Sequence, residues 1–324
     1  MDESRIDDLI LTPRQQANVD RIPRPLISKA EFVRDVKVAI ESGRGYAAGR
    51  LGMSQKHWMY YKVLVDRSMA NRKVLRLFEK RLRFHGLTQE GVFPADPQFY
   101  LRYNDFYIEH VRNLDSIGLY LNDWDVAMEK PIIDFYQLRN KLIYYAEQQP
   151  DRAVDGTGCC YLPYFRGKKI LIICPFASLL KERATREVFE GVWAKIGKAW
   201  FYPSQVDALE LPYGFSESTR QKYETAFDLY RDVISEVERR DFDIALIGAG
   251  GLAIPIASHI KNIAKIGIDI GGHLQIVFGV IGQKWRNIPR WQNDYYNEWW
   301  IDMPASYKPE EDACFEHGRP GAFW

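Results

Sequence analysis

Continuous apolar runs alternate with amphipathic stretches through the second half of the chain. The runs KKILIICPF and FDIALIGAG are apolar at their centres, which is typical of parallel strands buried on both faces. SLLKERATREVFEGVWAKI, TRQKYETAFDLYRDVISEVERRD and LAIPIASHIKNIA carry apolar residues at helical spacing, and KAWFYPSQV and KIGIDIGG are further strand candidates. The alternation predicts an α/β fold with a Rossmann-like parallel sheet flanked by helices, and ligands are expected at the carboxyl ends of its strands.

The first half of the chain is richer in helical patterns. Ser28 and Glu31 have the spacing of a helix capping box, and YAAGRLGMSQKHW is typical of a strand, a turn and the start of a helix. Further helices are predicted over 56–84, 97–114 and 132–149, with a short strand at SIGLYL. The predicted organisation is an extended arm over 1–25, a helix-rich part over 26–150, a Rossmann-like part over 151–303 and a tail over 304–324.

Composition excludes several classes of function. The 324 residues carry 44 Lys and Arg against 43 Asp and Glu, so no strong field attracts nucleic acid. The acidic start of the chain is unlike a signal or transit peptide, and no apolar run approaches the roughly 20 residues of a membrane helix. The four cysteines include no CxxC pair, as expected for reduced thiols. A cytoplasmic protein is predicted; peripheral association with a membrane and homo-oligomerisation are left open.

Glycines cluster after two of the predicted strands. Gly248, Gly250 and Gly251 stand between a strand and a helix, where a phosphate can approach main-chain amides closely. The alternative is that they only relieve crowding at the corner. The next predicted strand ends at Asp269, followed by another glycine turn and His273. Two such turns on neighbouring strands favour a phosphate or nucleotide site, although the dinucleotide fingerprint GxGxxG is incomplete.

A long stretch resembles a known family. The run DFDIALIGAGG, then PIASHIKNIAKIGIDIGGHLQIVFGVIGQKW, then NEWW is similar to bacterial surface-polysaccharide proteins assigned to the GT-D fold glycosyltransferases. The similarity spans roughly Ile27 to Ile301 and is strongest after Gly167. It implies a nucleoside-diphosphate sugar as donor, a glycan or lipid-linked acceptor, and the nucleotide-sugar site in the part over 151–303.

The chain departs from this family where the family carries acidic residues after the first strand. Arg50, Leu51 and Gly52 match the family pattern, but Met53 and Gln55 stand in place of its carboxylates. Neither a thioether nor an amide supplies the negative charge that Mg²⁺ or Mn²⁺ prefers. The sequence therefore disfavours a divalent metal at this point and predicts that cationic side chains or helix termini neutralise the leaving diphosphate.

Candidate roles follow from the chemistry of glycosyl transfer, which needs neutralisation of a diphosphate and a base near the acceptor. Asp115 is the first candidate for the base, ahead of Glu298 and His273. The predicted donor-binding residues are Arg50, Gly52, Gly248, Gly250, Gly251, Gly271, Gly272, Gln275, Lys284 and Arg286. The predicted acceptor or sugar contacts are Glu129, Trp285, Asn297 and Trp299.

Each candidate also has a purely structural interpretation. Lys284 and Arg286 are equally typical of solvated loop charges, Asp115 of a turn or cap, and the aromatic residues near the C-terminus of a flap that seals the edge of the sheet. At the level of function, the replacements at Met53 and Gln55 favour a non-catalytic nucleotide-sugar or glycan-binding protein as the alternative. A nicotinamide-dependent oxidoreductase is a third hypothesis, based on the GAG turn and Asp269.

Overall fold

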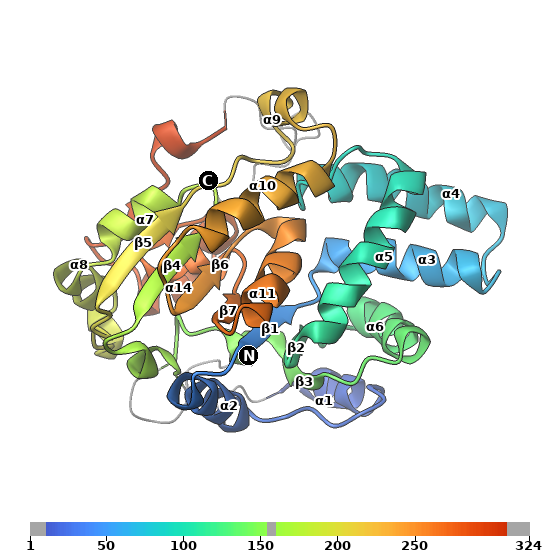
Figure 1. Cartoon of the computed structure of the whole chain (residues 1–324). Helices are drawn as coiled ribbons and strands as arrows, with labels where there is room; N and C mark the ends of the chain where they lie inside the picture. The colour runs from blue at the N-terminus through green and yellow to red at the C-terminus, as the bar shows by residue number, and fades with distance from the viewer. Residues whose placement is uncertain (1–10, 154–159, 310–324) are drawn as a thin grey trace.

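A parallel sheet of seven strands organises the fold. The computed structural model describes residues 11–153 and 160–309, and the strands are ordered β3-β2-β1-β7-β6-β4-β5 (Figure 1). Their bounds are β1 (Tyr46–Arg50), β2 (Ser116–Leu119), β3 (Lys141–Tyr144), β4 (Lys169–Ile173), β5 (Gln205–Leu209), β6 (Ile244–Ile247) and β7 (Ile266–Asp269). A small second sheet pairs β8 (Val280–Ile281) with β9 (Ile301–Asp302). The predicted α/β, Rossmann-like fold is confirmed.

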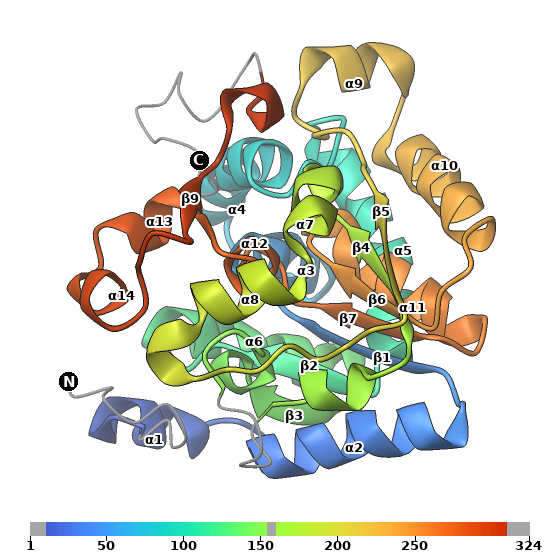
Figure 2. The same ribbon diagram turned by 90° about the vertical axis from the view of Figure 1, so that its left-hand side faces the viewer.

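Helices cover both faces of the sheet, as the two views show (Figures 1 and 2). One face packs against α3 (Met53–Asp66), α5 (Pro97–Asn113), α6 (Asp123–Tyr136), α10 (Ala226–Glu238) and α11 (Ala253–Asn262). The other packs against α2 (Lys29–Ser42), α7 (Ala177–Arg183), α8 (Arg186–Val192), α12 (His273–Val277), α13 (Gln283–Arg286) and α14 (Pro289–Asp294). In β4, Ile170 and Ile172 face the second layer while Leu171 and Ile173 face the first, which explains its continuous apolar run.

Three further helices and several short helical turns complete the part of the chain that the structure describes. The helices are α1 (Pro13–Val19), α4 (Arg72–Arg81) and α9 (Glu217–Lys222). The turns are the π-helical η1 (Leu82–Gly86) and the 3₁₀ turns η2 (Tyr145–Gln148), η3 (Leu162–Phe165), η4 (Ala194–Ile196), η5 (Gly250–Leu252) and η6 (Ala305–Tyr307). No helix in the described ranges has the length and apolar character needed to cross a bilayer.

Several predicted elements are confirmed and others are wrong. Ser28 caps α2 by accepting the Glu31 amide at 3.2 Å, and the strands at YAAGR and SIGLYL are present. The helix predicted over 132–149 is wrong, because α6 ends before Gln137 and Leu142 and Ile143 then pair with β2 in β3. A short apolar run of this kind fits a strand or a helix equally well until its pairing partner is known.

Other errors concern element boundaries. The predicted helix over 56–84 is interrupted between α3 and α4, where Ser68 has a φ of 51° and Asn71 caps the next helix. The long helix predicted from Thr219 is likewise split into α9 and α10. The strand expected at KAWFYPSQV lies later, as β5, and the arm predicted to be extended contains α1.

The order of the strands places the carboxyl ends of β7 and β6 in the middle of the sheet. The chain leaves β1 toward β2 and β3 at one edge, and leaves β4 toward β5 at the other. Because connections diverge from this central region, a crevice for ligand is expected there in an open parallel sheet. Both halves of the sequence contribute to it, since β1 pairs directly with β7.

Candidate functional site

Arg50 and Asp269 meet at the carboxyl edge of the sheet because β1 and β7 are paired in parallel, with Ala48 opposite Ile268. Asp269 is 3% exposed, and its carboxylate accepts the amides of Arg50 and of Gly271, the latter at 2.9 Å. The Arg50 guanidinium lies against Gly271, whose φ is 51° and where an added Cβ would fall 2.0 Å from Nη2. Only a residue without a side chain at position 271 leaves room for the Arg50 guanidinium beside the turn after β7.

Glu90 joins this pair from a segment that the sequence had not singled out. The segment follows the π-helical turn η1 and crosses the end of β6. Gln55 donates from Nε2 to Glu90 Oε2 at 3.1 Å and to the Gly250 carbonyl at 3.2 Å. A carboxylate is therefore present beside Gln55 although positions 53 and 55 lack one. The only signal in the sequence was an acid next to Gly91 in a Gly- and Pro-rich loop, which is weak on its own.

The two carboxyl groups have unusual proton affinities. Burial raises the pKa of Glu90 to about 7, against the opposing effects of the Gln55 hydrogen bond and the Arg50 charge, and Asp269 adds to the rise. Burial likewise raises the pKa of Asp269 to about 6, opposed by Arg50 and by two main-chain amides. Carboxyl groups that titrate near neutrality at a strand end are typical of functional sites.

Lys284 and His273 approach from the chain that follows β7. Desolvation by neighbouring groups and repulsion by Arg50 lower the pKa of Lys284 to about 7, and the residue as a whole is exposed. His273 Nδ1 lies 3.2 Å from the buried Asp151 carboxylate, and burial lowers its pKa to about 4. His273 is therefore neutral near pH 7, and its low pKa makes it only a weak base. We call Arg50, Glu90, Asp269 and Lys284 the strand-end cluster.

A stacked pair of tyrosines flanks the strand-end cluster. Tyr120 follows β2 and Tyr145 follows β3, and their ring centroids are 4.0 Å apart at an interplanar angle of 23°. Burial raises the pKa of both phenols while the Arg50 charge opposes the rise, so both rings lie within electrostatic reach of the guanidinium. Both residues are partly exposed. Sequence inspection missed this pair because each tyrosine becomes significant only once β2 and β3 are adjacent.

The glycine turn after β6 differs from the open phosphate loop that was expected. The Gly251 amide donates to the Glu90 carbonyl at 2.9 Å, and the Gly248 amide donates to Ile173 at 2.8 Å. A Cβ on Gly250 would lie 2.7 Å from the same Glu90 carbonyl oxygen. The prediction that the Gly251 amide faces a ligand is wrong, because the Glu90 segment covers this corner. The Gly52 amide is also engaged, by Gln55 Oε1 at 2.7 Å.

Two predicted acids lie away from the strand-end cluster. Asp115 precedes β2 and so lies at the amino edge of the sheet, where it accepts the Ala47 amide at 2.9 Å and pairs with Lys261 at 2.9 Å. Its assignment as the base beside the donor is therefore wrong. Glu129 is fully buried, 2.8 Å from Lys56 Nζ, and it also accepts the Tyr120 amide at 3.0 Å. A sealed carboxylate of this kind cannot contact an acceptor.

The C-terminal aromatic segment acts mainly as the structural flap that was the alternative interpretation. Asn297 donates to the Gly191 carbonyl at 3.0 Å, and the Trp299 ring packs against Gly191. Trp285 is buried, with its ring centroid 5.3 Å from that of His273 in an edge-to-face arrangement. Three other predicted residues lie in this region. Gln275 is buried and donates a hydrogen bond to the Val280 carbonyl. Arg286 forms an ion pair with Asp302, and Glu298 is exposed. Asn297 and Trp299 are thus corrected to structural roles.

The residues at the strand-end cluster fit a divalent metal poorly. Met53 is 51% exposed, and the Gln55 amide is used in hydrogen bonds to the protein itself. The Arg50 charge acts on both Glu90 and Asp269 and competes with a cation for them. Within 11–153 and 160–309, no group of three or more His, Cys, Asp or Glu side chains is arranged to hold a metal ion.

Comparisons with known proteins assign this chain to no family. No family model and no curated protein matches the sequence. Among solved structures, a chain described as "Selenomethionine substituted structure of domain of unknown function 1792 (DUF1792)" aligns over 95% of this chain and 97% of its own. The alignment has 11% sequence identity and a TM-score of 0.35, values too low to carry an argument about function.

Proposed function

We propose that this protein transfers a sugar from a nucleoside-diphosphate sugar to a glycan acceptor, with the donor diphosphate bound at the strand-end cluster. The observation that carries the proposal is that Lys284, from a distant part of the sequence, lies close enough to Arg50 at the end of β1 for the Arg50 charge to lower its pKa. Cationic side chains suit a diphosphate, because hydrogen bonds from a charged donor to phosphate are stronger than those between neutral groups. Open parallel sheets in general bind their ligands at the carboxyl ends of the strands, which is the edge where Arg50 lies.

The two acids at the site are compatible with an anionic ligand because of their proton affinities. With a pKa of about 7, Glu90 is neutral in a large share of molecules at neutral pH. Asp269 is held by the Arg50 and Gly271 amides and by the Arg50 charge. When the diphosphate draws protons onto Lys284 and Glu90, whose pKa values are both about 7, the charge facing it becomes positive, and the two cations take the part that a metal would otherwise play.

Glu90 is the acid best suited to activate the acceptor hydroxyl. A general base works best when its pKa lies near the operating pH, and Glu90 meets this condition while remaining partly exposed. The hydrogen bond from Gln55 to Oε2 fixes the orientation of the carboxyl group. In this proposal Asp269 positions Arg50, and the fraction of Glu90 that is ionised in the donor complex accepts the proton of the attacking hydroxyl.

The test is to incubate the protein with a panel of UDP-, GDP-, dTDP- and CMP-sugars. Nucleotide release measures turnover, and the thermal shift measures binding. We expect at least one diphosphate donor to bind and to be hydrolysed slowly without acceptor and without added divalent metal. CMP-sugars, which lack the second phosphate, should bind more weakly. Failure of every diphosphate donor to bind would contradict the proposal.

A pair of variants assigns any binding to the strand-end cluster. Arg50→Met should weaken UDP binding by about tenfold or more, as expected for loss of a hydrogen bond to a charged group. Arg76→Met is the control, since Arg76 is exposed on α4. Equal affinities in the two variants would place the nucleotide elsewhere. Tight donor binding without turnover would favour the non-catalytic alternative suggested by Met53 and Gln55.

A further inference from the structure

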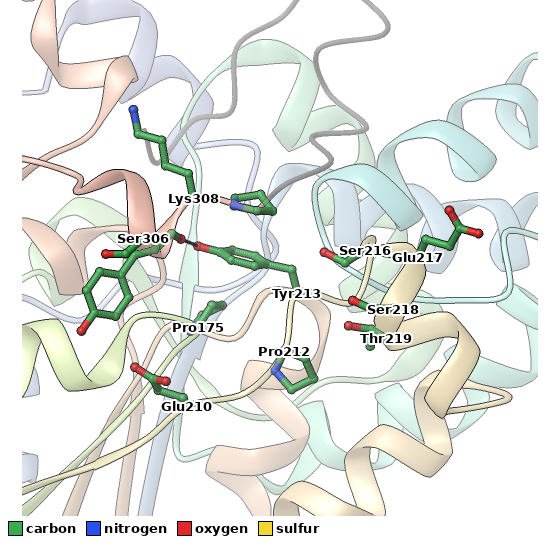
Figure 3. A pocket seen from close by; sticks show the side chains of 12 residues that line it. Pro175, Glu210, Pro212, Tyr213, Ser216, Glu217, Ser218, Thr219, Ser306 and Lys308 are labelled. Carbon is green, nitrogen blue, oxygen red and sulfur yellow. Dashed lines mark hydrogen bonds between the residues drawn. The ribbon is translucent and has the colours of Figure 1, made fainter.

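A second hollow lies on the same edge of the sheet, beyond the ends of β4 and β5. It has a volume of about 400 Å³. Figure 3 shows its lining, which comes from the segment after β4, the segment after β5, the start of α9 and the residues around η6. Its lining residues include Glu210, Tyr213, Ser218, Thr219, Tyr307 and Lys308. We call this hollow the β5 cavity.

The lining of the β5 cavity combines hydroxyls, carboxylates and tyrosines. Ser218 and Thr219 come from α9, and Figure 3 shows Glu210 and Glu217 on different sides of the hollow. The Tyr213 hydroxyl donates to the Tyr307 carbonyl at 3.0 Å, which joins the segment after β5 to η6. Glu210 Oε1 accepts the Ser178 amide at 3.1 Å and is thereby oriented.

This chemistry favours a neutral polyhydroxylated ligand. Carboxylates and hydroxyls accept and share the hydrogen bonds that sugar hydroxyls make, and aromatic rings pack on the apolar faces of sugar rings. Glu210 and Glu217 outnumber Lys308, which disfavours an anion. A metal ion is also disfavoured, because the described residues form no group of three or more metal-binding side chains.

The register of the sheet relates the β5 cavity to the strand-end cluster. Asp269 is paired with Ile247, Ile247 with Ile173, and Ile173 with Leu209, the residue before Glu210. Strands β7 and β5 are thus three spacings apart, about 14 Å at roughly 4.8 Å per spacing. A single sugar ring is too short to reach from one site to the other, whereas an oligosaccharide can bridge them.

We infer that the β5 cavity binds the glycan acceptor as an oligosaccharide, with its reactive end directed along the strand ends toward Glu90. This inference rests on the proposed function and adds to it a location and a substrate class. It predicts that acceptor affinity rises with chain length up to the span between the two sites. It also predicts that neutral oligosaccharides bind better than oligouronates of the same length, because of Glu210 and Glu217.

The experiment titrates the full chain, without nucleotide, with neutral di-, tri- and tetrasaccharides and with trigalacturonate, and follows tyrosine ring signals by NMR. Ser218→Trp fills the cavity, and Arg220→Trp adds the same bulk to an exposed position of the same helix that does not line it. We expect a neutral tri- or tetrasaccharide to bind, and Ser218→Trp to weaken it about tenfold, as loss of hydrogen bonds and access predicts. Arg220→Trp should bind as the unmodified protein does.

Two results would overturn the inference. One is that no neutral oligosaccharide perturbs the tyrosine signals while the protein still binds UDP. The other is that trigalacturonate binds in preference to every neutral sugar. Failure of UDP binding with retained oligosaccharide binding would instead contradict the proposed function and leave a glycan-binding site at the β5 cavity.

Discussion

Two groups of charged side chains lie beside the ends of β1 and β2, and they differ in access to solvent. Lys56 pairs with Asp125 and Glu129, and all three side chains are at most 1% exposed. In the strand-end cluster, Arg50, Glu90 and Lys284 keep exposed surface. The first group is closed to a ligand, and its Glu129 carboxylate accepts a hydrogen bond from the main-chain amide of Tyr120. The second group is open to solvent, so it can exchange protons and contact an anion. Accessibility, more than residue type, separates the sealed charges from those proposed to bind the donor.

The largest effect should come from breaking the sealed group. Lys56→Met leaves two buried carboxylates without their cation and should lower the free energy of unfolding by about 3–5 kcal/mol. Lys62→Met is the matched control on the same helix, since Lys62 is 22% exposed and its pairs with Asp66 and Asp105 face solvent. It should cost less than about 1 kcal/mol. Equal losses in urea denaturation would mean that the Lys56 group is not sealed.

A smaller effect is expected at the contact that holds the Glu90 segment in place. Gly250→Ala combines a φ of 52° with a Cβ 2.7 Å from the Glu90 carbonyl oxygen. Gly43→Ala has a similar φ, 64°, with nothing within 4 Å of the added Cβ. The backbone term alone should cost about 1–2 kcal/mol in both, and the crowding should add about 1–2 kcal/mol for Gly250. Equal costs would show that the Glu90 segment does not cover the turn.

Glu90→Gln should have an effect that depends on pH. The folded-state pKa of Glu90 is raised to about 7 from an ordinary 4.5, so its stabilising contribution is complete below pH 4.5 and is lost as pH rises through 7. The glutamine variant does not lose stability in this way. It should therefore be more stable than the unmodified protein at pH 8 by about 1–3 kcal/mol and differ little at pH 4. A gain independent of pH would contradict the assigned proton affinity.

The smallest effect is expected at the amino edge of the sheet. Asp115→Asn removes a partly exposed ion pair with Lys261, which should cost about 0.5–1 kcal/mol of stability. Because Asp115 lies at the opposite edge from Asp269, nucleotide affinity should stay unchanged, as measured by titration with UDP. A marked loss of affinity would return Asp115 to the functional site.

Much of the fold could be predicted from the sequence, because buried parallel strands such as β4 and β6 are continuous apolar runs. The helix predicted over 132–149 failed because four residues of β3 carry no periodicity of their own. At the site, Asp269 was recognised from its place at a strand end, and Arg50 from the family resemblance. Glu90, Tyr120 and Tyr145 were missed, because only the tertiary structure brings a loop and two neighbouring strands to the same edge.

The central claim is that a diphosphate binds among titrating groups of the strand-end cluster. An anion placed beside Glu90, Asp269 and Lys284 favours their protonated forms, so binding should be coupled to proton uptake at pH 7.5. Calorimetric titration of UDP in buffers of different ionisation enthalpy measures this uptake directly. The account predicts net uptake that is reduced in Glu90→Gln, whereas UDP binding without any uptake would contradict it.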